Sequence, residues 1–326
     1  MFVIGEDVLA RINNQRAEAC MYAGDFSNAL LYLDVAIQQN PRDACAHWNR
    51  AMCLLSLGRY PEGFAEFENR WDFSNWLWAL QKPNTKRVKP WASGEICGKR
   101  LLLVHDGGRG DNIMMLRYVP RLRELGALVT ILTVPELRRL AEQFGVEVIT
   151  EVPADLSRFD QQLAMFSIMA ALNETTETIP PPPYLKAMPR ANGCRIGLCW
   201  SGVSQTQFTQ EQLLDKLGLE GPQVQALQPG PTTYGVHPLP EGCDFLDVAE
   251  LALGLDHVVT VDTACANLMG ALGHPSTHLL LRTIMDFRWY YASSWYPTIR
   301  TYRQRVAHNW AEVFAQVRNA IAAVPA

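Results

Sequence analysis

The sequence predicts an α/β protein in which helical hairpins come first and two units of alternating strands and helices follow. Three observations carry this prediction: the first 80 residues resemble themselves at a shift of 34 positions, short apolar runs alternate with helical segments from residue 98 onward, and prolines 180–183 interrupt that alternation. We therefore expect domains over residues 1–80, 98–183 and 184–326, with a linker over 81–97.

Composition excludes several classes of protein. With 326 residues, 48% of them hydrophobic and 19% charged, the chain can bury sizeable cores and is not disordered. A net charge of −4 argues against nucleic acid as a partner. The N-terminus lacks the pattern of a signal peptide, and no apolar run of about 18 residues predicts a membrane span. Eight cysteines without a CxxC pair predict reduced thiols in the cytoplasm, and the histidines lack the spacing of metal ligands.

The first 80 residues have the period of tetratricopeptide repeats. The shift superposes Ala17 on Ala51 and Gly24 on Gly58, which predicts one hairpin from residues 12–22 and 26–39 and a second over 43–71. The second repeat carries Arg70 where the first carries a small residue. Two repeats fall short of the roughly three that a stable stack needs. We therefore expect the aromatic segment with Trp71, Trp76 and Trp78 to be buried against the following domain, and a short groove for a peptide or protein stays open as an alternative.

The first α/β unit begins with an apolar strand, 100–105, followed by a glycine-rich turn and a helix over 112–125. Such a corner either binds an anionic ligand or simply connects a strand to a helix. Further strands over 128–134 and 146–149, with a helix over 135–144, predict a parallel sheet.

The second unit repeats this alternation. Strands are predicted over 195–200, 224–227, 257–261 and 277–281, with helices over 245–254, 265–272 and 310–321. Asp262 and Thr263 are placed to cap the helix at 265, whose N-terminus can also bind a diphosphate. The aromatic run 287–296 either stacks on a base or sugar or packs in the core.

The chain resembles bacterial tetratricopeptide proteins fused to a GT-B glycosyltransferase, which are related to heptosyltransferases and O-linked N-acetylglucosamine transferases. The segments that carry the resemblance occur in family order and cover most of the chain: YPEGFAEFENRW (60–71), WASGE with GKRLLL (91–103), GRGDNIMMLRYVP (108–120), PPYL (182–185), RIGLCWSG (195–202), ALQ (226–228), VDTACANLMGALGHP (261–275), DFRW (286–289) and SWYPTIRTYRQ (294–304).

The resemblance implies a GT-B-like pair of Rossmann-like domains facing each other, with the last helix, 310–321, crossing back to the first of them. It further implies metal-independent transfer of a sugar from a nucleotide-diphosphate donor to a protein or glycan acceptor, without another cofactor. Asp111 occupies the position of the catalytic base. The residues expected to hold the nucleotide sugar are Gly108, Arg109, Gly110, Ser201, Gly202, Gln228, Asp262, Thr263, Ala264, Asn267 and Arg288.

Two departures from the family pattern keep a second function open. Asn267 stands where members usually carry histidine, and the segment 203–212 lacks the expected basic residues. A catalytically degenerate binding or scaffold protein is therefore the alternative, whereas the acidic balance disfavours a transferase that modifies nucleic acid.

Overall fold

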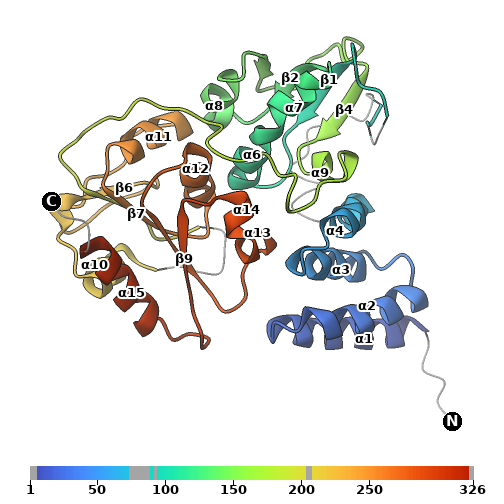
Figure 1. Cartoon of the computed structure of the whole chain (residues 1–326), viewed down its shortest axis with the longest axis horizontal. Coiled ribbons are helices and arrows are strands. Elements are labelled where there is room, and N and C mark those ends of the chain that lie inside the picture. The colour runs from blue at the N-terminus through green and yellow to red at the C-terminus, as the bar shows by residue number, and fades with distance from the viewer. Residues whose placement is uncertain (1–5, 73–88, 92–93, 203–207, 323–326) are drawn as a thin grey trace.

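The computed structural model describes residues 6–72, 89–91, 94–202 and 208–322. Helical hairpins form the N-terminal part, and two parallel sheets with their helices form the rest (Figure 1), so the predicted α/β class is confirmed. No helix in the described ranges is long and apolar enough to cross a bilayer.

The two hairpins follow the 34-residue period. Asp25 and Asp43 begin a helix in each repeat by accepting a backbone N–H three residues further on, and Gly24 and Gly58 supply the left-handed turns between helices. Ala17 and its repeat mate Ala51 are both fully buried. The predicted hairpins are confirmed, while their tetratricopeptide assignment stays a prediction. The elements are α1 (Glu6–Tyr22), α2 (Phe26–Gln39), α3 (Ala44–Ser56), α4 (Tyr60–Phe67) and the 3-10 helix η1 (Glu68–Asp72).

The N-terminal sheet has the strand order β3-β2-β1-β4, and all its pairs are parallel. Its strands are β1 (Arg100–Val104), β2 (Leu128–Leu132), β3 (Glu147–Ile149) and β4 (Gln161–Ala164). Its helices are α6 (Arg109–Met115), η2 (Leu116–Tyr118), α7 (Val119–Glu124), η3 (Pro135–Leu137), α8 (Arg138–Glu142) and α9 (Ser167–Ala171). Residues 89–91, which we expected in a linker, lie against β4 through hydrogen bonds between Trp91 N and Gln162 O and between Gln162 N and Lys89 O.

The C-terminal sheet has the order β6-β5-β7-β8-β9 and is also parallel throughout. Its strands are β5 (Ile196–Cys199), β6 (Val224–Ala226), β7 (His257–Val261), β8 (Thr277–Leu281) and β9 (Ile299–Arg303). Its helices are α10 (Gln210–Leu217), η4 (Gly221–Gln223), α11 (Phe245–Leu253), α12 (Ala264–Leu272), α13 (Phe287–Tyr290), α14 (Ala292–Trp295) and α15 (Ala311–Ala322).

The last helix does not cross to the N-terminal sheet, so that prediction is wrong. Val313, Phe314 and Val317 of α15 pack with Val259 of β7 and Leu214 of α10, and Figure 1 shows α15 beside α10. The apolar face of α15 is buried within its own domain, because the face of the C-terminal sheet beside α10 also has to be buried.

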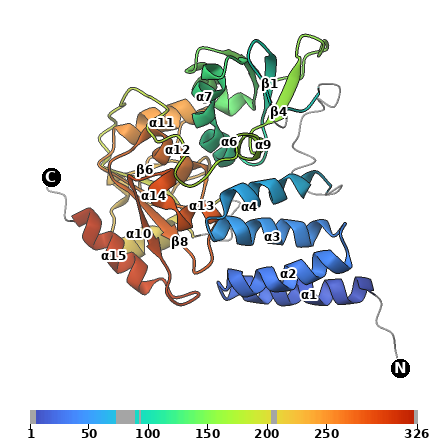
Figure 2. The same cartoon turned by 45° about the vertical axis from the view of Figure 1, so that its right-hand side comes forward.

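The second hairpin shares a core with both α/β domains. Tyr60, Phe64 and Phe67 belong to the same buried cluster as Leu103 of β1 and Phe287 of α13. In Figure 2, α4 lies next to α9 and α3 next to α13, as the contacts between these helices require. Of the tryptophans predicted to be buried here, Trp71 is half-buried, and Trp76 and Trp78 lie outside the described residues.

Candidate functional site

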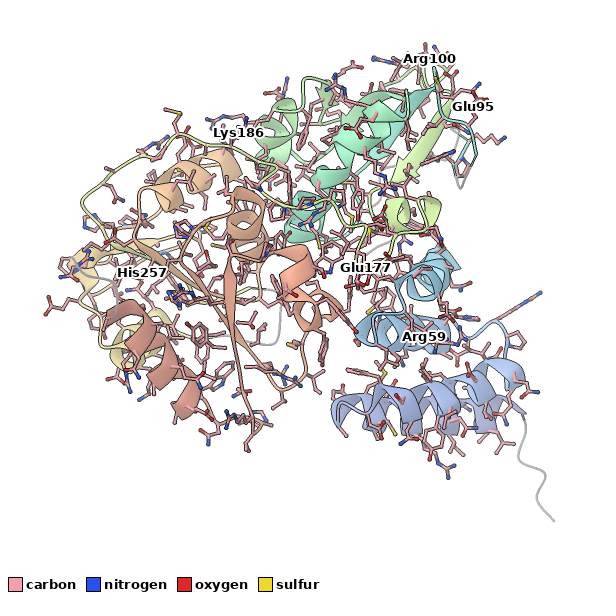
Figure 3. The ribbon with its side chains drawn as sticks, viewed as in Figure 1. Arg59, Glu95, Arg100, Glu177, Lys186 and His257 are labelled. Atoms are coloured by element: carbon pink, nitrogen blue, oxygen red, sulfur yellow. The ribbon has the colours of Figure 1, made fainter. Side chains whose placement is uncertain are left out.

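The carboxyl ends of the two sheets meet at one interface. β1 leads through the glycine-rich turn into α6, β7 leads through Asp262 and Thr263 into α12, and α6 packs on α12. Figure 3 labels Arg100 and His257, the first residues of β1 and β7, far apart in the upper right and the left of the view. Open α/β sheets bind ligands at the carboxyl ends of their strands, so this interface is the candidate site.

Gly110 makes the closest approach across this interface. A β-carbon on Gly110 would lie 2.8 Å from Asn267 Nδ2 and 3.0 Å from Ala264 Cα, so only glycine lets α6 come this close to the start of α12. The predicted residues Gly110, Ala264 and Asn267 are thus brought together.

The glycine-rich turn is braced by Asn112. Its Oδ1 accepts the N–H of Asp106 at 3.0 Å, and its Nδ2 donates to the carbonyl oxygens of Asp106 at 3.2 Å and Gly108 at 2.7 Å. Gly108 is the N-cap residue of α6, and its N–H donates to Asp111 Oδ2 at 2.9 Å. The turn therefore holds the expected base in one orientation.

Asp111 is paired with Arg288 of the other domain. Arg288 Nη2 donates to Asp111 Oδ1 at 2.7 Å, Nε donates to Asp286 Oδ1 at 2.7 Å, and Nη1 donates to Asn267 Oδ1 at 3.2 Å. The Asn267 amide also accepts the Tyr296 hydroxyl at 3.2 Å and donates to Thr263 O at 3.2 Å. Both carboxylate oxygens of Asp111 and both polar atoms of Asn267 thus have partners within the protein.

The start of α12 lacks the side-chain cap that the sequence predicted. Thr263 is the N-cap residue, but its hydroxyl lies 3.2 Å from Thr260 Oγ1 and 3.5 Å from Cys199 Sγ, and no side chain of the described residues caps the helix. The first N–H groups of α12 consequently have no side-chain acceptor, although Gly110 packs beside them.

Asp262 stands at this helix terminus in an acidic surrounding. Burial and the neighbouring carboxylate of Asp286 raise the pKa of Asp262 to about 6, and the Arg288 guanidinium opposes this shift. Three carboxylates therefore lie near one guanidinium, that of Arg288. They belong to Asp111, Asp262 and Asp286. Among the described residues, no group of three or more His, Cys, Asp or Glu side chains is arranged to hold a metal ion.

Ser201, Gly202 and Gln228 gather beside the same terminus. Gln228 Oε1 accepts the N–H groups of Trp200 at 2.7 Å and Ser201 at 3.0 Å, and its Nε2 donates to Ser201 Oγ at 3.0 Å. A β-carbon on Gly202 would lie 2.5 Å from Thr263 Cγ2. Gln228 thus fixes the turn after β5, and Gly202 of that turn packs against Thr263 at the start of α12.

Arg109 is not brought into the site. It is exposed and donates to Glu136 at 3.1 Å, with about half of each side chain accessible to solvent. Sequence reasoning missed Asp286 as a partner of the site, and it offered Tyr296 only within the aromatic run 287–296, for stacking or core packing. Both residues lie in the DFRW and SWYPT segments that carry the family resemblance.

Comparisons with known proteins give only distant similarities. No protein-family model matches the chain. It is 26% identical over 366 aligned positions to Protein FlbA of Caulobacter vibrioides, in an alignment covering 94% of this chain and 60% of FlbA, so the chain spans less than two thirds of that relative.

Two solved structures are similar at low TM-scores. One is the iron-containing dodecameric glycosyltransferase TibC from enterotoxigenic E. coli, with a TM-score of 0.42, 12% identity and 59% of each chain covered. The other is a mutant of the Thermobaculum terrenum O-GlcNAc transferase, with a TM-score of 0.28, 14% identity, and 96% of this chain and 85% of that chain covered. Neither likeness bears on what this chain binds or does.

Proposed function

We propose that the chain is a glycosyltransferase that moves a sugar from a nucleotide-diphosphate donor to a hydroxyl group of a protein or glycan acceptor. The observation that carries the proposal is the Asp111–Arg288 pair, with 2.7 Å between Oδ1 and Nη2, which joins the first turn of α6 to α13 of the opposite domain. A carboxylate and a guanidinium at the carboxyl ends of two facing sheets are suited to an acceptor proton and a leaving diphosphate respectively.

In the proposed reaction the acceptor oxygen attacks the anomeric carbon as the bond from that carbon to the diphosphate breaks. Asp111 takes the acceptor proton, and the diphosphate leaves with the electron pair of the broken bond. The proposed transfer is metal-independent: the N–H groups at the start of α12 and the guanidinium of Arg288 stabilise the diphosphate.

Arg288 Nη2 already donates to Asp111 Oδ1 at 2.7 Å and to Asp286 Oδ2 at 3.3 Å, so both of its N–H groups are in use and one bond must be released before this nitrogen can bind the diphosphate. We therefore expect the donor to draw Arg288 Nη2 away from Asp111 Oδ1, which frees that oxygen for the acceptor proton. In this scheme donor binding precedes activation of the base, and a site without donor holds the base inactive.

A thermal-shift screen against nucleoside diphosphates and sugar nucleotides tests the binding half of this proposal. A ligand at 100 times its dissociation constant stabilises the fold by about 2.7 kcal/mol. With the donor that the screen finds, Asp111→Asn should abolish transfer and retain or tighten donor binding, because the base acts on the acceptor proton and its loss releases Arg288 for the diphosphate. Loss of donor binding in Asp111→Asn with transfer retained would contradict the assigned role.

A binding or scaffold protein without chemistry is the second candidate. It is favoured by the saturation of Asp111 and Asn267 with protein partners and by the contact of Gly110 with the start of α12. If no nucleotide or sugar nucleotide raises the melting temperature, a binding or scaffold function replaces the proposed glycosyltransferase function.

A further inference from the structure

A buried ion pair ties the helical hairpins to the glycine-rich turn. Arg70 of η1 donates through Nη2 to Asp106 Oδ2 at 2.7 Å, and the two residues are 2% and 1% exposed. Asp106 is the residue that follows His105 at the end of the first strand and opens the turn. A charged pair in a core is costly unless its geometry is well satisfied, so its presence here calls for a role.

The surroundings of Arg70 hold its guanidinium in place. Nη2 also donates to Ser167 Oγ at 2.9 Å, and Nη1 donates to Glu68 Oε1 at 2.5 Å. The guanidinium carbon lies 4.6 Å from the ring centre of Phe67 and 4.1 Å from that of Trp71. Arg70 is therefore fixed by groups from both the hairpin and the N-terminal domain.

Hydrogen bonds, linked through the covalent bonds of Asp106 and Gly108, lead from Arg70 to the proposed base. Asp106, whose carboxylate Arg70 holds, is bonded through its backbone N–H and carbonyl to Asn112. Asn112 also donates to the carbonyl oxygen of Gly108 at 2.7 Å, and the Gly108 N–H donates to Asp111 Oδ2 at 2.9 Å. The position of the Asp106 carboxylate therefore bears on the position of the Asp111 carboxylate.

The same hairpin also contacts the segment that carries Arg288. Phe287 packs edge-to-face on Tyr60, with ring centres 6.0 Å apart, and on Phe64, with ring centres 5.8 Å apart. Trp295 Nε1 donates to the Tyr60 hydroxyl at 2.8 Å. The second hairpin thus contacts the turn that precedes Asp111 and also Phe287, the residue next to Arg288.

We propose that Arg70 is a positioning residue of the site, through which the second hairpin sets the glycine-rich turn and hence Asp111. The role of Asp111 in this inference rests on the proposed function. The 34-residue period supports a specific task for Arg70, because its repeat mate is Ala36. Ala36 is fully buried in the core of the first hairpin, whereas Arg70 reaches out of the second hairpin into the α/β body.

The test uses the full chain and the double variant Arg70→Met with Asp106→Asn. Arg70→Met alone leaves the Asp106 carboxylate buried without its counter-ion and is expected to unfold readily, whereas replacing both partners by neutral groups of similar size is often tolerated. The backbone bonds of Asp106 to Asn112 remain available in the double variant. Its melting temperature should therefore stay close to that of the parent.

Two readouts separate positioning from a merely structural role. Hydrogen–deuterium exchange should become about tenfold faster at the amides of Gly108 and Asn112, because the turn loses its anchor to the hairpin. In the transfer assay kcat should fall about 100-fold while KM for the donor stays within about twofold, because misplacing the base affects the chemical step.

The matched control is Arg50→Met with Asp34→Asn. This pair joins the first hairpin to the second, with Arg50 Nε 2.7 Å from Asp34 Oδ1. Arg50 is half-buried and also donates to Glu66, Asp34 is exposed, and neither touches a residue of the turn. This control should leave both readouts at parental values.

Parental exchange at Gly108 and Asn112 in the Arg70/Asp106 double variant overturns the proposal, as does faster exchange with an unchanged kcat. If the parent transfers no sugar from any donor, the proposed glycosyltransferase function fails, and the exchange measurement still decides whether the hairpin sets the turn.

Discussion

Arg288 Nη2 lies 2.7 Å from Asp111 Oδ1, and this contact joins two parallel sheets that share no strand. The side chains of Arg288 and Asp111 are 7% and 20% exposed, so the pair is poorly screened by solvent. Because Arg288 also bonds Asp286 and Asn267, one guanidinium organises polar groups from three segments of the chain.

Arg288→Met should lower the free energy of unfolding by about 3 kcal/mol, because it leaves the partners of a buried guanidinium without a counter-charge. Urea denaturation of the parent and the variant measures this loss. Arg109→Met is the matched control, since Arg109 pairs with Glu136 at 3.1 Å on the surface. Its loss should not exceed about 1 kcal/mol. Equal losses of unfolding free energy in the two variants would show that the buried pair stabilises the fold no more than the surface pair does.

Gly110→Ala should force α6 away from α12. The added β-carbon would meet Asn267 Nδ2 at 2.8 Å and Ala264 Cα at 3.0 Å, and backbone cannot yield as a flexible side chain can. We expect a loss of about 1–3 kcal/mol in thermal or urea unfolding. At Gly108, where the nearest atom to an added β-carbon is Asp111 Oδ2 at 3.3 Å, alanine should cost less than about 1 kcal/mol. The reverse order of the two losses would contradict the close approach.

Buried histidines should make the fold sensitive to acid. Burial lowers the pKa of His278 to about 4 and also lowers the pKa values of His257 and His274. In the unfolded chain these side chains take up a proton near pH 6.5. The unfolded state therefore binds more protons between about pH 6.5 and 4, and the free energy of unfolding falls as the pH falls through that window.

Urea denaturation at pH 7.5 and pH 4.5 measures this effect, to which His278 alone should contribute about 2.5 kcal/mol. His278→Phe should flatten the dependence, whereas His308→Gln, at an exposed position, should leave it unchanged. If the parent and His278→Phe lose stability equally on acidification, His278 is not the group that resists protonation.

The elements that the sequence predicts well are the buried ones. The apolar runs of β1 and β7 stand out because both faces of a central parallel strand are covered. β4 and β9 are not predicted. Each is the last of the named strands at one end of its sheet, and its sequence, QQLA or IRTYR, contains polar residues that give no continuous apolar run. Their place in the sheet follows from long-range pairing, which no local pattern displays.

The same distinction holds at the candidate site. The gathering of Ser201, Gln228 and Thr263 at one place could be predicted because each follows a strand, and the carboxyl ends of parallel strands lie at one edge. The partner of Asp111 could not, because Arg288 is 177 residues away and belongs to another domain. Arg70 did leave a signal, since a charged residue stands at a repeat position whose mate is the buried Ala36, but the sequence alone does not show that its partner is Asp106.

The last prediction concerns the charge of Asp262 and the affinity for the donor. The pKa of Asp262 is raised to about 6, so its carboxyl group is largely neutral at pH 5.5 and negative at pH 7.5. If the donor diphosphate lies at the start of α12, as we propose, the added negative charge should repel it. The dissociation constant of a sugar nucleotide should then rise about three- to tenfold between these two pH values, which corresponds to one charge acting at short range. Calorimetry with a sugar nucleotide is suited to this test because both its phosphates are esterified, whereas a phosphomonoester itself titrates near pH 6.

Asp262→Asn should remove this pH dependence and bind as the parent does at pH 5.5. Asp256→Asn is the matched control at the other end of β7, where Asp256 pairs with Arg195 on the surface, and it should keep the parental dependence.

The same raised pKa predicts that Asp262→Asn stabilises the fold at pH 7 by about 1–3 kcal/mol, because the folded state holds the carboxylate less favourably than the unfolded chain does. That gain should shrink as the pH falls below about 6 and vanish below about pH 3, where the carboxyl group is protonated in both the folded parent and its unfolded chain. An affinity that stays flat or strengthens from pH 5.5 to 7.5, together with the expected stability gain, would place the diphosphate away from Asp262 while leaving the charge assignment intact.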